Sequence, residues 1–219
     1  SIASAYGTVQ IERSIFEGCI APLGDGGGLS LQAKAAQLRG NVFHHNTARR
    51  GGAAFIEGRG GALVLNNNTI ADNLAEGLAG AAGGLQFVKS GIDGAATALW
   101  ASNNLVWGNN AGNDRYDIDV SGLSANAAVL RYNHLGTVKG TPAPSSSNTS
   151  AGDPRFVVAS PVLWSDYETR SDSIVRNSGN NSPAGGLTTW DVAGVKRVQG
   201  SAVDRGAFEI DELFGNGFD

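Results

Sequence analysis

Charged residues near the middle of the chain alternate in a way that could build an acid–base or calcium site. The two-residue period of a strand would place Arg115, Asp117 and Asp119 on one exposed face. Aligned carboxylates can act as an acid–base pair, and they supply the oxygen ligands that Ca²⁺ takes. Asp117 and Asp119 are therefore candidate catalytic and metal-ligating residues, with Arg115 beside them. A solvated strand face that carries no site is the alternative.

Two adjacent histidines offer a second place for proton transfer. Glu17 and His44, and likewise His45 and Asp72, are separated by 27 residues, a spacing that recurs along the chain. If successive coils stack at that period, His45 lies over Asp72 and Glu17 over His44. A His–carboxylate pair can serve as a base and the group that orients it. No Ser or Cys nucleophile falls in register with them, so polar surface and a metal-binding histidine pair are the alternatives.

Exposed aromatic side chains would instead indicate binding without catalysis. Trp107 falls at the outward position that Glu17 occupies in the first repeat, and an exposed tryptophan can stack on the apolar face of a sugar. Trp107 is therefore a candidate ligand-binding residue. Aromatic residues that follow the repeats are expected to pack inside a C-terminal cap; these are Trp164, Tyr167 and Trp190.

The composition excludes several classes of protein. The 219 residues carry a net charge of −4, which gives no electrostatic reason to bind nucleic acid or an anionic membrane. No apolar stretch approaches the ~18 residues of a transmembrane helix, and one cysteine cannot form an internal disulfide or a cysteine-based zinc finger. The chain begins at Ser1 and contains no Met, so we expect a processed piece of a longer precursor.

A repeat of about 27 residues organises the first two thirds of the chain. The segment that starts at Asn41 matches segments that start at Ser14, Asn68, Asn104 and, more weakly, Asn133. Apolar residues alternate on both sides of each copy, which is the period of a half-buried strand. Three short strands per repeat, with turns between them, describe one coil of a parallel β-helix. We therefore predict an all-β, right-handed, single-stranded parallel β-helix of about five coils.

Stacked coils would place like residues in columns, because equivalent strands of successive coils pair ~4.8 Å apart. An inward apolar column is expected from Phe16, Phe43, Ile70 and Val106. Asparagine tolerates the left-handed conformation of a corner, and stacked amides can hydrogen-bond from coil to coil. Two structural ladders are predicted, one of Asn41, Asn68, Asn104 and Asn133 and another of Asn46, Asn73 and Asn109. Cys19 precedes the second ladder and is expected to be buried.

The repeat predicts three parts of the chain. Residues 1–139 would form the coils, and residues 140–151, rich in Pro, Ser and Thr, would be a linker-like loop. Because stacked coils leave an apolar disc at each end, residues 152–219 are expected to be a C-terminal cap packed on the last coil. The chain starts almost inside a coil, so we expect the upstream part of its precursor, or a partner, to cover the first coil.

The repeats and the C-terminal segment resemble known bacterial proteins. The first and last elements of the choice-of-anchor Q region are similar to Asp153-Pro154-Arg155-Phe156 and to Val203-Asp204-Arg205-Gly206-Ala207-Phe208-Glu209. A middle element departs from that pattern, with Arg176-Asn177 where Ile-Asp is usual. The repeats resemble the right-handed parallel β-helix repeats of secreted and surface proteins. The resemblance implies an exported bacterial protein, extracellular or on the outer surface, and it implies no particular reaction.

Two functions from different classes stay open. The first is a non-enzymatic secreted or surface β-helix module, an adhesin-like or carbohydrate-contacting scaffold that meets an extracellular polysaccharide and needs no cofactor. The second is a polysaccharide lyase or glycoside hydrolase on the same fold, with Arg115, Asp117 and Asp119 as its site and Ca²⁺ as its metal. A smooth polar face would favour the first function, and a cleft lined by three or more carboxylates would favour the second.

Overall fold

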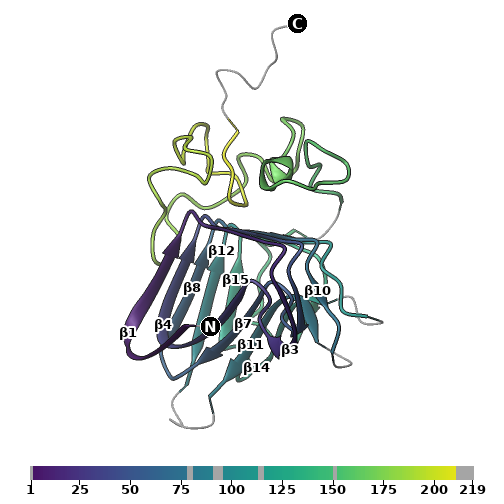
Figure 1. Cartoon of the computed structure of the whole chain (residues 1–219). Helices are drawn as coiled ribbons and strands as arrows, with labels where there is room; N and C mark the ends of the chain where they lie inside the picture. Colours follow the sequence, from purple (N-terminus) through teal and green to yellow (C-terminus); the bar gives the residue numbers. More distant parts are fainter. Residues whose placement is uncertain (1, 78–80, 91–95, 113–115, 150–151, 211–219) are drawn as a thin grey trace, which may run out of the picture.

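The first two thirds of the chain wind into a spiral whose successive coils pair side by side in parallel (Figure 1). The computed structural model describes residues 2–77, 81–90, 96–112, 116–149 and 152–210. Five equivalent corners, from Ser14 to Asn133, bound about four complete turns. The predicted all-β parallel β-helix is confirmed. Within the described ranges, the structure holds no helix long and apolar enough to cross a bilayer.

Two rows of parallel strands form two faces of the solenoid. The first row contains β1 (Ile2–Glu12), the second half of β4 (Leu29–Arg39), β8 (Ala62–Asn66), β12 (Ala98–Ser102) and β15 (Ala128–Arg131). The second row contains β2 (Ile15–Glu17), β5 (Val42–His44), β9 (Thr69–Ala71), β13 (Leu105–Trp107) and β16 (His134–Leu135). The corner between the two rows holds the first asparagine ladder.

Two further rows close the coils. Short strands line the bend after the second row: β3 (Ile20–Asp25), β6 (Thr47–Arg50) and β10 (Leu74–Ala75). The last row begins with the first half of β4 and continues through β7 (Ala54–Gly58), β11 (Ala82–Lys89), β14 (Tyr116–Gly122) and β17 (Val138–Lys139). The early coils therefore contain a short bend strand in addition to the three strands that the sequence predicts.

The inward apolar columns form the core. The predicted column is confirmed: Phe16 pairs with Phe43, Phe43 with Ile70 and Ile70 with Val106. The rings of Phe16 and Phe43 stack with their centroids 4.4 Å apart and their planes 3° apart. A side chain in such a column is covered by its equivalents in the coils on both sides, which is why Phe43, Ile70 and Val106 are buried.

Glycine at the start of the last row lets neighbouring coils approach closely. A Cβ on Gly52 would lie 2.3 Å from the carbonyl oxygen of Gly83 in the next coil, far inside van der Waals contact. Gly27 and Gly83 make the same close approach to the coils that follow them. Because any side chain here would push two coils apart, the repeat keeps glycine in front of its third predicted strand.

Both asparagine ladders are confirmed. In each complete rung, the Oδ1 atom accepts hydrogen bonds from the peptide N–H and the Nδ2 atom of the preceding asparagine; from Asn46 to Asn73 these bonds are 3.0 and 2.9 Å long. The first ladder joins Asn41, Asn68, Asn104 and Asn133, and the second joins Asn46, Asn73 and Asn109. All seven side chains are buried. The ladders therefore satisfy the polar groups that two corners of the solenoid bury.

The predicted linker contributes one more rung and closes the end of the solenoid. Asn133 donates from its peptide N–H and its Nδ2 atom to the Oδ1 atom of Asn148, at 3.0 and 3.1 Å. The peptide N–H of Ala143 donates to the carbonyl of Ala128, at 2.8 Å. Residues 142–145, 148 and 149 line a cavity together with apolar residues of the last coil. Residues 140–149 thus lie on the last coil, where the sequence predicts a cap from residues further on.

Residues 152–210, called the C-terminal cover below, run along the side of the solenoid (Figure 1). They meet the last coil through Arg205, which donates to the carbonyl of Asn133 at 2.9 Å. They also meet earlier coils, because the carbonyl of Asp204 accepts from Asn67 and that of Asp191 accepts from Arg13. The one helix described in it is the short 3₁₀ helix η1 (Trp164–Tyr167). The segment expected to cap the last coil is therefore mainly a lateral cover.

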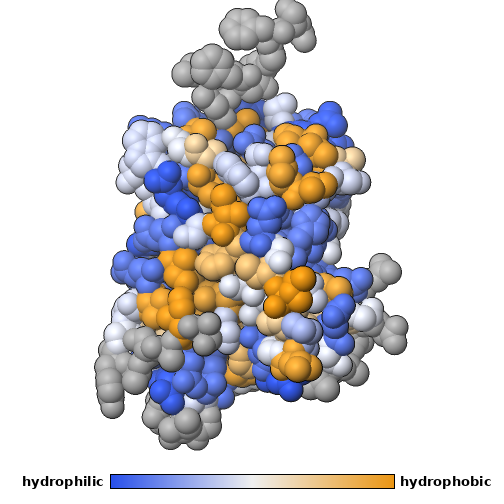
Figure 2. Space-filling model, viewed as in Figure 1, coloured by the Kyte–Doolittle hydropathy of each residue, from blue (hydrophilic) through white to orange (hydrophobic). Residues whose placement is uncertain are grey.

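The first coil leaves large apolar side chains in contact with solvent. Ile20 is 73 % exposed and Leu23 is 91 % exposed. Figure 2 shows apolar side chains gathered on the face where this coil lies. Cys19 is exposed, so its predicted burial is wrong: it lies in the first described coil, where its contact is with the coil of Asn46. That an upstream part of the precursor or a partner covers this coil stays a prediction.

Candidate functional site

A pocket opens where the last coil is shorter than the coil before it. Ile118 comes 14 residues after the ladder residue Asn104, whereas its partner Val138 comes only five residues after Asn133. The last coil passes directly from β16 to β17 and omits the bend that the fourth coil makes. The space left is a cavity of about 400 Å³, called the coil-4 pocket here, lined by Trp107, Gly108, Asn109, Asn110, Asp117, Gly136 and Thr137.

Two residues proposed from sequence for different roles meet in the coil-4 pocket. Trp107 ends β13, is half-buried, and its ring packs against the ring of His134 with centroids 5.1 Å apart. Asp117 lies near the start of β14 and takes the place of the next rung in the second ladder. Its Oδ1 atom accepts from the peptide N–H and the Nδ2 atom of Asn109, both at 2.9 Å, and its Oδ2 atom accepts from the N–H of Thr137 at 2.8 Å.

The missing bend also leaves a backbone acceptor facing the pocket. In the earlier coils, the carbonyls of Cys19, Asn46 and Asn73 each accept a peptide N–H from the coil above, at 2.8 to 2.9 Å. Asn109 is next in this column, and no N–H from the described residues reaches its carbonyl oxygen. The neighbouring side chain of Asn110 is exposed. A ligand in the pocket would thus meet an aromatic ring, a carboxylate, a peptide carbonyl and a side-chain amide.

Burial controls the charge of this site. Burial raises the pKa of the Asp117 carboxyl, and the nearby carboxylate of Asp72 raises it further. Hydrogen bonds from Asn109 and Thr137 act in the opposite direction, because all three donors favour the ionised form. Burial also lowers the pKa of His134, behind Trp107, which keeps that imidazole neutral near pH 7. Asp117 is the acidic group of the pocket lining, and its three hydrogen-bond donors favour its ionised form.

Gly136 makes room for this arrangement, and its replacement by alanine is expected to disturb it. A Cβ on Gly136 would lie 2.0 Å from the Oδ2 atom of Asp117, which is held by its hydrogen bonds. We expect Gly136→Ala to lower the free energy of unfolding by about 1–3 kcal/mol, as overpacking does. Urea denaturation monitored by circular dichroism measures the change. An unchanged midpoint would mean that Asp117 is not anchored as described.

The expected exposed face of β14 is not present. Arg115 lies outside the described residues, and Asp117 and Asp119 are 5 % and 1 % exposed, so the prediction that both carboxylates face solvent is wrong. The Oδ1 atom of Asp119 accepts from the Ser121 hydroxyl, and its Oδ2 atom accepts from Gln86 and lies 3.5 Å from the Nζ atom of Lys139. The two carboxylates therefore serve separate networks rather than one acid–base pair.

The histidine pair lies beside Tyr167 of the C-terminal cover, and His45 is exposed. Glu17 pairs with His44 as predicted, with 3.7 Å between the carboxylate and the Nε2 atom, and His45 aligns with Asp72. His44 is fully buried and its Nδ1 atom lies 3.1 Å from that of His45. Asp72 accepts a 2.8 Å hydrogen bond from the hydroxyl of Tyr167. Burial lowers the pKa of His44, so its neutral ring packs against Tyr167 of the cover.

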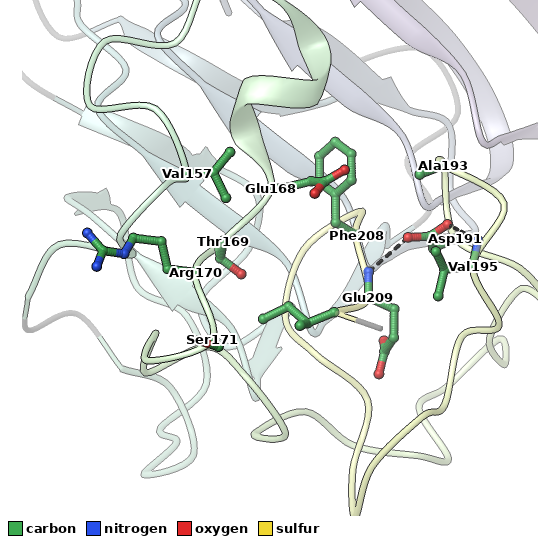
Figure 3. Close-up of a pocket in the computed structure, with 11 residues that line it drawn as sticks. Val157, Glu168, Thr169, Arg170, Ser171, Asp191, Ala193, Val195, Phe208 and Glu209 are labelled. Atoms are coloured by element: carbon green, nitrogen blue, oxygen red, sulfur yellow. Dashed lines mark hydrogen bonds between the residues drawn. The ribbon is translucent and has the colours of Figure 1, made fainter. Parts of the chain in front are cut away.

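A second cavity, of about 320 Å³, lies within the C-terminal cover (Figure 3). Three acidic residues line it, but Asp191 accepts from the peptide N–H groups of Val195 and Glu209, at 2.7 and 2.9 Å, and so holds two loops together. In Figure 3 the carboxylate of Glu209 points away from that of Glu168. The acids therefore do not converge on one point in the cavity, and the coil-4 pocket remains the better candidate.

Metal binding by Asp117 and Asp119, or by the histidine pair, stays a prediction. Among the described residues, no three His, Cys, Asp or Glu side chains gather as a metal ion would require. For the coil-4 pocket, the residue types alone indicated Trp107 and Asp117 but not that they meet. The signal that could have placed them together is the short interval between Asn133 and β17, which leaves no residues for a bend.

Comparison of the chain with protein-family models, with curated proteins and with solved structures gave no match.

Proposed function

We propose that this protein is a non-enzymatic β-helix module that binds carbohydrate through the coil-4 pocket. The observation that carries the proposal is the meeting of Trp107 with hydrogen-bond acceptors in a cavity of about 400 Å³. Small-molecule sites are concave, have apolar and aromatic walls, and hold few polar groups. A sugar has an apolar C–H face that stacks on an aromatic ring and hydroxyl groups that donate hydrogen bonds. The pocket offers partners for both.

The polar groups of the pocket suit hydroxyl donors in particular. The carbonyl of Asn109 has no N–H partner among the described residues, and the carboxylate of Asp117 has room for further hydrogen bonds beyond the three it accepts. An acceptor that is left bare when a ligand displaces water lowers affinity, so a ligand rich in O–H groups is favoured.

The contacts that already hold the carboxylates of Asp117 and Asp119 support binding rather than catalysis. A general base must reach the proton that it removes, and a retaining or inverting glycosidase needs two carboxyl groups across one bond. Asp117 ends a ladder, and Asp119 is held by Gln86, Ser121 and Lys139. The alternative of a polysaccharide lyase or glycoside hydrolase rests on Arg115, Asp117 and Asp119 and stays the second candidate. We also propose that the protein is exported from a bacterial cell, because its repeats and its C-terminal cover resemble those of secreted and surface proteins.

Replacing Trp107 tests the proposal. A glycan array identifies ligands for the full chain, and calorimetric titration then compares the wild type with Trp107→Ala. We expect the substitution to weaken binding by at least ~30-fold, because a tryptophan that a ligand covers is typically worth ~2 kcal/mol or more. Trp100→Ala is the matched control, since Trp100 is 42 % exposed on the first face, outside the pocket. We expect it to bind as the wild type does.

Two outcomes would contradict the proposal. Either no glycan binds, or the Trp107→Ala and Trp100→Ala variants bind equally well. Incubation of the bound polysaccharide with the protein separates binding from catalysis. New reducing ends without unsaturation would support a hydrolase, and unsaturated sugars that absorb in the ultraviolet would support a lyase.

A further inference from the structure

We infer that the coil-4 pocket selects neutral sugars and rejects sugars that carry a carboxylate or sulfate. This inference rests on the proposed function and names the class of sugar that the same site takes. It follows from the charges that surround the pocket and from how each nearby cation is held.

The negative charge of the pocket comes from two elements. Asp117 of β14 lines it directly. Asp72, from the turn after β9, lies beneath Gly108: a Cβ on that glycine would be 3.0 Å from the Oδ1 atom of Asp72. The two carboxylates already repel each other, which is one reason why the pKa of Asp117 is raised. An anionic sugar would bring a third negative charge to a partly desolvated place.

No positive charge in the described part of the lining offsets these carboxylates. Two cations of the described residues near the last coil have other partners. Lys139 lies 3.5 Å from the carboxylate of Asp119, and Arg205 donates to the carbonyls of Asn133 and Ser178. His134, packed behind Trp107, is neutral because burial disfavours its charged form. An anion in the pocket would thus find no counter-charge among the described lining residues.

The hydrogen-bond acceptors of the pocket also favour neutral sugars over anionic ones. The peptide carbonyl of Asn109 and the carboxylate of Asp117 both require a donor. A sugar hydroxyl is a donor, whereas a carboxylate or sulfate group offers acceptors alone. Replacing one hydroxymethyl group by a carboxylate would therefore turn a favourable contact into repulsion between like charges, and such juxtaposition is how binding sites reject unwanted ligands.

Matched pairs of polysaccharides test the inference on the full chain at pH 7. Each pair shares a backbone and differs at C6: oligosaccharides of glucan and glucuronan, of mannan and mannuronan, and of galactan and galacturonan. We expect the neutral member of a bound pair to bind at least ~10-fold more tightly than the acidic member. Raising the salt concentration should narrow this ratio in the wild type, because salt screens repulsion between charges.

Two variants assign the preference to the carboxylates. Asp117→Asn and, separately, Asp72→Asn remove one negative charge each with little change of shape, and both should bring the ratio closer to one. Thermal melts check that each variant is folded. If either variant is not folded, the salt dependence of the wild-type binding ratio tests the inference instead.

The outcomes separate this inference from the function on which it rests. Equal or tighter binding of the acidic member, or a ratio that neither salt nor Asp117→Asn changes, overturns the preference for neutral sugars while carbohydrate binding stands. If neither member of any pair binds, carbohydrate binding itself is wrong and the preference falls with it.

Discussion

Replacing Asn73 with alanine is expected to lower the free energy of unfolding by roughly 3–5 kcal/mol, a large effect for a single substitution. The Oδ1 atom of Asn73 accepts two hydrogen bonds from Asn46, and its Nδ2 atom donates to Asn109 and to the carbonyls of Phe43 and Ala71. Alanine removes all five bonds and leaves their partners buried without replacement.

Urea denaturation of the wild type and Asn73→Ala, followed by circular dichroism, measures this loss. Asn110→Ala is the matched control: Asn110 is an exposed asparagine in the equivalent bend of the next coil, and its replacement is expected to change stability by less than ~0.5 kcal/mol. If Asn73→Ala were no more destabilising than Asn110→Ala, the ladder would not contribute to stability in the way its geometry indicates.

The features that sequence alone predicted correctly are those that repeat from coil to coil. Phe43 and Ile70, or Asn46 and Asn73, are spaced by one coil, so the same local environment selects the same kind of residue each time. In a parallel stack, residues that are one repeat apart in sequence are neighbours in adjacent coils. Register, inward columns and both ladders could therefore be read from spacing and residue type.

The candidate site was only partly predictable, because it lies where the repeat fails. Strand alternation correctly separated Asp119 from the inward Ile118, yet it could not show that the outward side of β14 is itself covered. Asp117 was expected at the surface, whereas it replaces an asparagine in the second ladder. That substitution depends on the bend missing from the last coil. A periodic pattern says nothing about a place where the period is broken.

The lateral position of the C-terminal cover was not predictable for a different reason. The cover binds corner residues whose backbone is left-handed, among them Arg13, Asn67 and Asn103, with φ of 50°, 53° and 59°. In sequence these positions carry only the mark of a turn. Asparagine is common at such φ values whether or not its side chain meets another segment. The contacts are made between residues far apart in the chain that share no repeat, so spacing gave no sign of them.

Stability is expected to fall as the pH rises from about 5 to 9, and Glu209 accounts for much of that fall. Its side chain is 1 % exposed, 3.9 Å from Arg197, and its Oε2 atom accepts from the N–H of Asp204. Burial and the nearby carboxylate of Asp204 outweigh the attraction of Arg197 and raise the pKa of Glu209 from its ordinary 4.5 to about 8. The folded state thus holds a proton that the unfolded state has released.

The sign follows from this difference in bound protons. Below pH 4.5 both states are protonated at Glu209 and the stabilising effect of the neutral form is complete; between 4.5 and about 8 the folded state alone keeps the proton, so the free energy of unfolding decreases as pH rises. Glu209→Gln keeps an oxygen acceptor for Asp204 and cannot ionise. We expect this variant to match the wild type near pH 4 and to exceed its stability by up to ~4 kcal/mol at pH 9.

Urea denaturation at unit intervals from pH 4 to pH 9 measures the two profiles. Glu76→Gln is the matched control, since Glu76 is an exposed glutamate on the solenoid, and its profile should follow that of the wild type. Parallel profiles for Glu209→Gln and the wild type would mean that Glu209 is ionised in the folded state. In that case Arg197, which donates to the carbonyls of Gly206 and Ala207, would hold the carboxylate as a buried ion pair.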